Sequence, residues 1–478
     1  MNSSNNPFNA KLEQVIITKF NGTDRLSIMP QVAEFTLHQS IFSPILKADM
    51  VIVDGIGLMD NYPWSGEEKV EVELIQDGEE EGNAGTGQKQ FFKLLTFIIS
   101  AIKDINIDND GRTTTYIIEL ASYDAFTNAK TRVSHAYNED IEGMIEKVYN
   151  DYIIKNRTDP KPKELKIFKD TQKIRKLVIP NIKPFDAIAW LCKFAISSDP
   201  EKYYTHMFYE TIDNYTFKVL QKPTFRGKED NDAFEAAKKE KYIYVGDISL
   251  IRNNPKALQQ LQARGFSDSR IINDMKINKR YSALEKIIGG YFENELVEIN
   301  MLKNDHKITR KELKYEDAEF NTINPKKGYN TAEYIENVKD EYKEPETSAR
   351  IRYIINNYDD ENQPSFRDKF GRSAMSFIAF QQVDISIAIN TNLLMRVGDV
   401  IFIELPEFHG FNLNDADKYL SGFYVISEIK TIMKQGGKSA SYVRINRDSF
   451  TNNLALKYEY NPSANDPKVS TTNPRGPR

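Results

Sequence analysis

A short block of sequence occurs twice in this chain, and the two copies keep their order and spacing. The first copy reads Ile99-Ser100-Ala101-Ile102-Lys103-Asp104-Ile105 and is followed by Asp124-Ala125-Phe126-Thr127-Asn128. The second reads Ile426-Ser427-Glu428-Ile429-Lys430-Thr431-Ile432 and is followed by Asp448-Ser449-Phe450-Thr451-Asn452. β-Strand propensity does not dictate the shared serine or the shared Asp-x-Phe-Thr-Asn ending. Two equivalent β-modules in one chain are therefore predicted.

A further match lies upstream of each copy. Gly66-Glu67 leads into the alternating pattern Val70–Leu74, which is typical of a half-buried strand. Gly398-Asp399 leads in the same way into Val400–Leu405. The duplication is therefore expected to include one strand before each repeated block.

The turn after the first block could be mistaken for a calcium loop. If Gly111 is placed at the sixth position of such a loop, the twelfth position is Ile117, where a bidentate glutamate is needed. The equivalent turn after the second block, Gln435-Gly436-Gly437, has no carboxylates. Both are predicted to be tight hairpin turns.

The composition is that of a folded protein with several domains. The chain has 478 residues, of which 40% are hydrophobic, and a single core rarely grows to that size. Its formal net charge of −5 gives no general attraction to nucleic acid. With Cys192 as its only cysteine, it has no intrachain disulfide and no zinc site built from cysteines. We find neither a run of roughly 18 apolar residues nor a secretory signal, so synthesis in a cytoplasm is expected.

The expected fold class is α+β, mainly antiparallel β, in which two related β-barrel domains flank an α+β inserted region. Alternating apolar residues indicate strands, and the spacing of Ile141, Ile145 and Val148 indicates a helix. Within the inserted region, the charged residues 222–241 are expected to form a surface excursion. The expected domains are a first β-barrel domain at 1–128, an α+β inserted domain at 129–241, strand and helix segments with a polar hairpin arm at 242–365, a second β-barrel domain at 366–458 and a flexible C-terminal tail at 459–478.

Two longer patterns carry a resemblance to a known family. In the N-terminal block, Phe35-Thr36-Leu37-His38-Gln39-Ser40-Ile41-Phe42-Ser43-Pro44 is followed by Ala48–Asp54 and by Gly66-Glu67. In the C-terminal block, Arg372-Ser373-Ala374-Met375 is followed by Val383–Ile389 and by Arg396-Val397-Gly398-Asp399-Val400-Ile401. With these patterns the chain resembles the central baseplate hub proteins of contractile-tailed bacteriophages, and its two barrels look like tail-tube domains.

The resemblance implies a structural virion protein that is not an enzyme. Copies of the chain would form a homotrimer, in which the two barrels alternate around a pseudo-hexameric ring. One face would continue the sixfold tail tube protein, the other would hold the threefold central spike protein, and other baseplate proteins would bind around the ring. DNA would pass non-specifically through the channel. The implied location is the tail baseplate of the virion, after assembly in the host cytoplasm.

Strands that join neighbouring subunits are the candidate functional site, because an open strand edge must be covered. Four strands are candidates for this role, at Val32–Leu37, Ala48–Val53, Val383–Ile389 and Val400–Leu405. The predicted subunit-interface residues are Val32, Phe35, Leu37, Met50, Ile52, Val383, Ile385, Ile387, Ile401 and Ile403.

No residue pattern predicts catalysis, a cofactor or a metal. The histidines are isolated in the sequence, and Cys192 lies on an apolar helix face, which is typical of a buried thiol. Lys238–Tyr242 is the nearest candidate for DNA binding, but its mixed charges favour a solvated surface. Two alternatives stay open: a spike-associated cell-wall hydrolase with its active site in 129–365, and a carbohydrate-binding tail component that uses the tyrosine-rich hairpin at 203–215.

Overall fold

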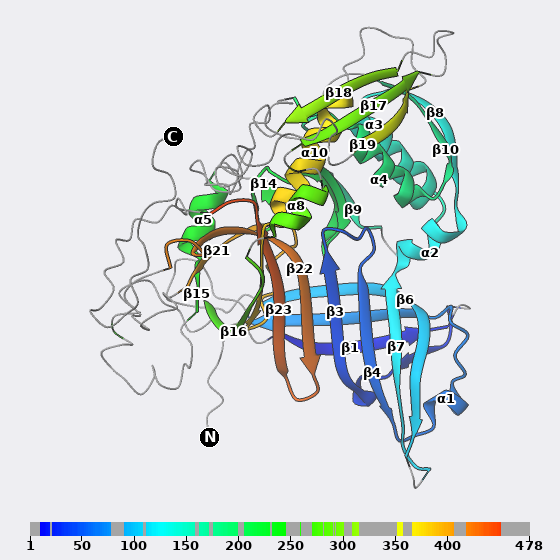
Figure 1. The fold of residues 1–478 in the computed structure, drawn as a ribbon. Helices are drawn as coiled ribbons and strands as arrows, with labels where there is room; N and C mark the ends of the chain where they lie inside the picture. Colours follow the sequence, from blue (N-terminus) through cyan, green and yellow to red (C-terminus); the bar gives the residue numbers. More distant parts are fainter. Residues whose placement is uncertain are drawn as a thin grey trace.

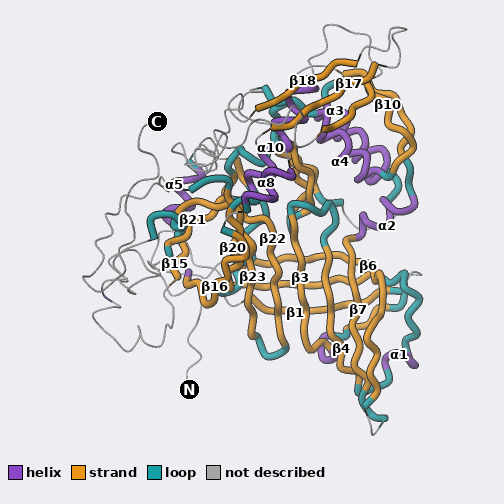
Figure 2. The backbone as a smooth tube through the Cα atoms, viewed as in Figure 1, coloured by secondary structure: helices purple, strands orange, loops and turns teal. Residues whose placement is uncertain are grey.

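The structure is a computed structural model of the chain, in which β-strands dominate (Figure 1, Figure 2). A 13-stranded sheet runs through the molecule, and four smaller sheets accompany it. The structure describes residues 10–19, 22–77, 90–108, 111–157, 162–171, 175–198, 205–229, 232–244, 259, 270–280, 282–289, 291, 293–300, 308–314, 351–356, 366–405 and 417–450.

The first module is a folded-over sheet of N-terminal strands, all paired antiparallel in the order β2-β1-β5-β6-β7-β4-β3. The strand β6 pairs with β5 in its first half and with β7 in its second, so it joins two layers that cross each other (Figure 1). Val70, Val72 and Leu74 on β5 alternate into the core between the layers, as the sequence predicts. The elements are β1 (Ala10–Thr18), β2 (Arg25–Ser27), η1 (Met29–Gln31), β3 (Val32–Ser40), β4 (Lys47–Asp54), α1 (Leu58–Asn61), β5 (Lys69–Asp77), β6 (Gln90–Ile107), β7 (Thr114–Ser122) and α2 (Tyr123–Lys130).

The inserted domain that follows mixes helices and strands. The helix predicted from Ile141, Ile145 and Val148 is confirmed as α3, which Asp140 caps by accepting a hydrogen bond from the Gly143 N–H, and Pro184 opens a second helix, α4. Their apolar faces share a core with the antiparallel hairpin β11–β12. The elements are β8 (Val133–Glu139), α3 (Ile141–Val148), the π-helix η2 (Tyr149–Ile154), β9 (Glu164–Ile167), β10 (Arg175–Ile182), α4 (Pro184–Phe194), β11 (His206–Glu210) and β12 (Asn214–Val219).

The charged residues 222–241 lie at the surface, as predicted, but they do not form a separate excursion, because part of the segment packs against the second module. They form a small hairpin of β13 (Thr224–Phe225) and β14 (Lys228–Glu229), followed by α5 (Ala233–Lys239). Ala233 and Ala237 are fully buried, and Phe234 packs edge-on against Phe423 of the second module. This helix has a narrow apolar stripe, which is hard to recognise in the sequence because the average charge of the segment is high.

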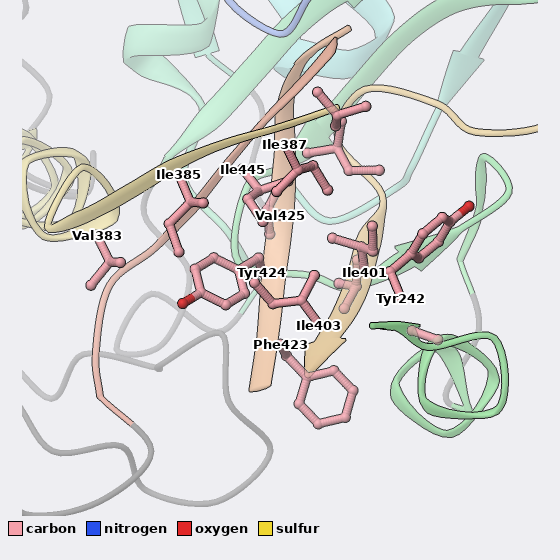
Figure 3. Packing of buried hydrophobic residues seen from close by; sticks show 14 of the residues in the cluster. Tyr242, Val383, Ile385, Ile387, Ile401, Ile403, Phe423, Tyr424, Val425 and Ile445 are labelled. Atoms are coloured by element: carbon pink, nitrogen blue, oxygen red, sulfur yellow. The ribbon is translucent and has the colours of Figure 1, made fainter. Parts of the chain in front are cut away.

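The second module is built from strands that pair in a cycle, β22-β21-β15-β16-β20-β23, in which β23 returns to β22. The strand β15 pairs in parallel with β16 and with β21, whereas the other pairings of the cycle are antiparallel. Apolar side chains from these strands converge on one core, where Tyr424 and Ile445 are fully buried (Figure 3). The strands are β15 (Tyr242–Tyr244), β16 (Ile271–Lys279), β20 (Val383–Ile389), β21 (Val400–Glu404), β22 (Gly422–Lys434) and β23 (Lys438–Arg447).

A smaller group of elements precedes the last strands of the second module. It contains α8 (Ala283–Gly289), β17 (Glu293–Asn300), β18 (Ile308–Lys314), β19 (Ile351–Asn356) and α10 (Phe366–Phe380). The strands β17 and β18 form the predicted antiparallel hairpin arm, and β19 adds in parallel. The predicted tail at 459–478 lies outside the described residues. In the part of the chain that the structure describes, no helix has the length and apolar character needed to cross a membrane.

Candidate functional site: the junction between the two modules

The two copies of the repeated block occupy equivalent positions in the two modules. The first copy lies on β6 and the second on β22, and each strand continues into a hairpin, with β7 or with β23. In each hairpin the repeated serine has no partner in the strand ladder. The register shifts between Ile99 and Ala101 in the first hairpin and between Ile426 and Glu428 in the second. A bulge of this kind bends a strand and increases its twist. Both long strands can therefore change neighbours along their length.

The serines at the two bulges make the same hydrogen bond. Ser100 Oγ donates to the Glu119 carbonyl at 3.0 Å, and Ser427 Oγ donates to the Arg444 carbonyl at 3.0 Å. Ser427 is buried and also donates to Asn446 Oδ1 at 2.6 Å, whereas Ser100 is exposed. Because a bulge disrupts the backbone ladder, a hydroxyl at this position supplies a partner for a nearby carbonyl. This is a physical reason for the serine in both copies.

The turn before each module's hairpin is equivalent as well. Gly66 and Gly398 have left-handed backbone angles, with φ of 83° and 84°, a conformation that glycine adopts without strain. The Ile426 N–H donates to the carbonyl of Asp399, one residue after Gly398, at 2.9 Å, and the Ile99 N–H donates to the carbonyl of Glu68, two residues after Gly66, at 3.2 Å. The turn, the strand after it and the hairpin thus form one repeated unit.

The equivalence continues into strands whose sequences show no match. In the first module the ladder of β3 with β4 skips one residue, between Val32 and Glu34. In the second module the ladder of β16 with β20 skips one residue, between Ile272 and Asp274. The order of pairing is the same, since β6-β7-β4-β3 corresponds to β22-β23-β20-β16. Backbone pairing reveals this part of the duplication because bulges tolerate many side chains.

The two modules meet edge to edge through β3 and β22, and we call this ladder the module junction. It is antiparallel and runs from Ser40 opposite Glu428 to Glu34 opposite Lys434. The side chains of Glu34 and Lys434 form an ion pair at 3.3 Å, and Met433 of β22 is buried in the core of the first module. The junction merges both modules into the 13-stranded sheet (Figure 2).

The predicted interface residues all lie inside the chain's own cores. Their strands are also paired on both sides: β3 with β4 and β22, β4 with β3 and β7, β20 with β16 and β23, and β21 with β22 and β15. Alternation marks the buried face of a strand, but it does not distinguish a core from a subunit interface. The residues are Val32, Phe35, Leu37, Met50 and Ile52 in the first core and Val383, Ile385, Ile387, Ile401 and Ile403 in the second (Figure 3).

A charged cluster ties the inserted domain to both modules. The Asp213 carboxylate, between β11 and β12, accepts hydrogen bonds from Lys93 Nζ on β6 at 2.6 Å and from Arg396 Nε at 2.5 Å. Burial alone would raise the pKa of Asp213, but the charges and hydrogen bonds of Arg396 and Lys93 outweigh burial and hold this pKa below its usual value. An ionised Asp213 therefore links the three parts of the chain.

A second polar contact holds the turn before β21. Lys218 Nζ donates to the Gly398 carbonyl at 3.0 Å, and the Thr224 hydroxyl donates to the same carbonyl at 2.9 Å. Tyr209 lies so close on the other side that a Cβ at Gly398 would overlap its hydroxyl. This glycine of the repeat is therefore enclosed by the inserted domain, whereas its counterpart Gly66 has open space around it.

The outer face of the module junction is polar, and ion pairs lie on either side of it. A hollow of about 600 Å³ lies there, lined by residues of β3, β16, β20, β22 and β23. Each lysine or arginine in the following set has an acidic partner, which reduces the field that the face presents to an anion. The pairs are Arg444 with Asp384 at 3.0 Å and with Glu428 at 3.5 Å, and Lys103 with Glu119 at 2.6 Å. The His38 ring forms a hydrogen bond with Asp49 at 2.9 Å.

The side chains that could bind a metal are dispersed in the described ranges. Within them, no three His, Cys, Asp or Glu side chains gather as metal ligands would. His38, His135 and His206 lie on β3, β8 and β11, and the other two histidines lie outside these ranges. Cys192 is buried, as predicted.

No family model matches the sequence, and no curated protein matches it. Among solved structures, the chain is similar to the tail protein from Neisseria meningitidis MC58, with 10% identity, a TM-score of 0.47 and coverage of 91% of this chain and 96% of that chain. It is also similar to the 43 kDa tail protein of prophage MuSo2 from Shewanella oneidensis, with 9% identity, a TM-score of 0.49 and coverage of 91% and 98%. Both of these structures are described as tail proteins.

A third similar structure comes from a secretion machine. It is an E. coli component of the type VI secretion system, which is itself described as structurally similar to bacteriophage T4 tail proteins. It matches with 8% identity, a TM-score of 0.38 and coverage of 95% of this chain and 79% of that chain.

Proposed function

We propose that this chain is a structural hub of a phage-type tail baseplate, which joins a sixfold tail tube to a threefold central spike. The observation that carries the proposal is the equivalence of the two modules, which extends to their bulges and their order of strand pairing. Three chains with two such modules each present six similar units around one axis, although the true symmetry is threefold. Such a homotrimer can match a sixfold tube protein on one face and a threefold spike protein on the other.

We propose that the modules are the two tube-like barrel domains, at 1–128 and 366–458, and that the second also includes β15 and β16. The closed cycle of strand pairing supports a barrel in the second module. The candidate interface residues would then act indirectly, by holding the strands of the ring in place from within the two cores. In this arrangement the inserted domain would be available to contact other baseplate proteins.

We propose that the outer face of the module junction lines the channel of the ring. DNA phosphates bind chiefly to lysine and arginine side chains that can neutralise them. On this face Arg444, Lys103 and Lys434 already have acidic partners, whereas the described residues show none for the exposed Lys430, which also lines the hollow. DNA could therefore pass with few strong contacts. The chain would act in the tail of the virion after assembly in the host cytoplasm, with no catalytic role.

The carbohydrate-binding alternative depends on tyrosines of the hairpin at 203–215. Sugar binding by aromatic side chains needs an accessible ring face. In the described part of this hairpin, Tyr209 and Tyr215 are buried in the chain's own cores. Their burial favours a structural role for the hairpin.

The mass of the particle in solution tests the hub directly. A trimer has three times the 55.1 kDa mass of the chain, and it is expected because the free strand edges of one chain require a partner. Light scattering or native mass spectrometry would measure this mass, with and without the spike protein. A monomer under both conditions would contradict the proposed function.

A further inference from the structure

The second half of β6 has one unpaired edge. Up to Ile98 this strand pairs with β5 on one side, and from Phe97 onward it pairs with β7 on the other. Among the described residues, no strand continues the β5 side along Ile99–Ile107. The equivalent part of β22 is covered, because β3 pairs there beyond the end of β21.

A complementary edge is found on β16. This strand pairs with β20 on one side, and with β15 only at Ile271 and Ile272 on the other. From Asn273 to Lys279, the β15 side has no strand partner in the ranges that the structure describes. The equivalent strand β3 uses this same side to pair with β22. Each chain thus contains one complete module junction. It also contains the two strand edges, on β6 and on β16, from which a second ladder of the same kind could form.

Exposure at these edges supports a missing partner. Phe35 and Leu37 on β3 are fully buried, whereas Met275 and Ile277, at the same positions relative to the bulge of β16, are only partly buried. On β6, Ile105 is 50% and Ile107 69% exposed. Open edges with apolar side chains tend to recruit another strand, and the bulges at Lys103–Asn106 and Ile277–Lys279 limit where such a strand can pair.

We infer that β16 of one copy adds antiparallel to the second half of β6 of the next copy, in the register of the module junction. In the module junction, Ile432 lies opposite Thr36. Ile105 is the counterpart of Ile432 in the repeat, and Lys276 is the counterpart of Thr36 relative to the bulge, so Lys276 would lie opposite Ile105 of the neighbouring chain. Main-chain hydrogen bonds would supply affinity, as in other cases of strand addition. The contact is head-to-tail, and it closes into a ring of three when the rotation between neighbouring copies is one third of a turn, as the proposed trimer requires. This inference rests on the proposed trimer and specifies its subunit boundary.

Cysteine cross-linking tests the register. Ile105→Cys would be combined in turn with Met275→Cys, Lys276→Cys and Ile277→Cys, because the bulge near Asp104 can move the pairing by one residue. Directly opposite residues in an antiparallel ladder have Cβ atoms about 4.5 to 5.5 Å apart, and the closer, non-hydrogen-bonded pairs are within reach of a disulfide. We expect one of these pairs to give covalent dimers and trimers on a denaturing gel, and nothing larger. Phe92→Cys with Lys276→Cys is the matched control, because Phe92 lies on the paired half of β6 and is 55% exposed.

A second variant measures assembly without a cross-link. Ile107→Asp should shift the particle toward monomer by at least tenfold in the concentration needed for assembly, while its circular dichroism stays unchanged, because Ile107 is exposed in the single chain. Phe92→Asp should assemble normally. The β6–β16 boundary would be overturned if the protein is a trimer by mass, none of the three cysteine pairs cross-links and the Ile107→Asp variant assembles normally. That result would leave the hub proposal intact. A monomeric parent protein would overturn the hub itself.

Discussion

Gly398→Ala should lower the free energy of unfolding by about 3 kcal/mol, whereas Gly66→Ala should lower it by only about 1 kcal/mol. Both glycines have left-handed backbone angles, so both substitutions incur the same conformational strain. The difference comes from their surroundings, since a Cβ at Gly398 would overlap the buried Tyr209 hydroxyl and a Cβ at Gly66 would meet nothing. Chemical denaturation of the two variants and the parent measures both values.

A double variant shows whether the clash is the cause. Tyr209→Phe removes the hydroxyl that lies nearest to the added Cβ, so Gly398→Ala in that background should lose less stability than in the parent. Such non-additivity is expected for residues in contact. Equal losses at Gly398 and Gly66 would show that the inserted domain does not enclose the second turn as described.

Asp213→Asn should destabilise the protein by about 2 kcal/mol near neutral pH, because it leaves Lys93 and the nearly buried Arg396 without their carboxylate. We place the value below that of a fully buried pair, because the Asp213 side chain is 35% exposed and solvent screens it. Asp49→Asn, which removes an exposed partner of His38, should change stability by less than about 0.5 kcal/mol. Urea unfolding of the three proteins measures these differences.

The pH dependence of the same variant has a definite sign. The pKa of Asp213 in the folded chain lies below its ordinary value of 3.8, so its contribution to stability is present above that pH and is lost as the pH falls toward the native pKa. The difference between parent and Asp213→Asn should therefore be constant from neutral pH down to about pH 5 and shrink below pH 4. A difference that grows on acidification would contradict the ionised bridge.

Much of the second module could be predicted from its sequence. The alternating apolar residues of Val383–Ile389 and Val400–Leu405 identify strands, and the repeated serine marks what the structure shows to be a bulge. The segment 222–241 could not be predicted, because the burial of Ala237 depends on a surface of β21 that is distant in the sequence. Tertiary contacts of this kind leave no periodic signal in a charged segment.

The location of the free strand edges could not be predicted either. Val32–Leu37 has the apolar alternation of a strand, and the structure shows that both edges of this strand are already occupied within the chain. Within the described part of the chain, the edges without a strand partner belong to Ile99–Ile107 and Asn273–Lys279, where polar and apolar residues mix. Which edge is open depends on the order of strands in the sheet, and side-chain alternation carries no information about that order.

Rotational symmetry of the assembled particle is the most direct measurement of the central claim, that each chain supplies two equivalent units to one ring. Electron-microscopy averages viewed along the ring axis should show six lobes, which superpose approximately after one sixth of a turn and fully only after one third of a turn. A ring of six complete chains, or a particle with twofold symmetry, would contradict the account.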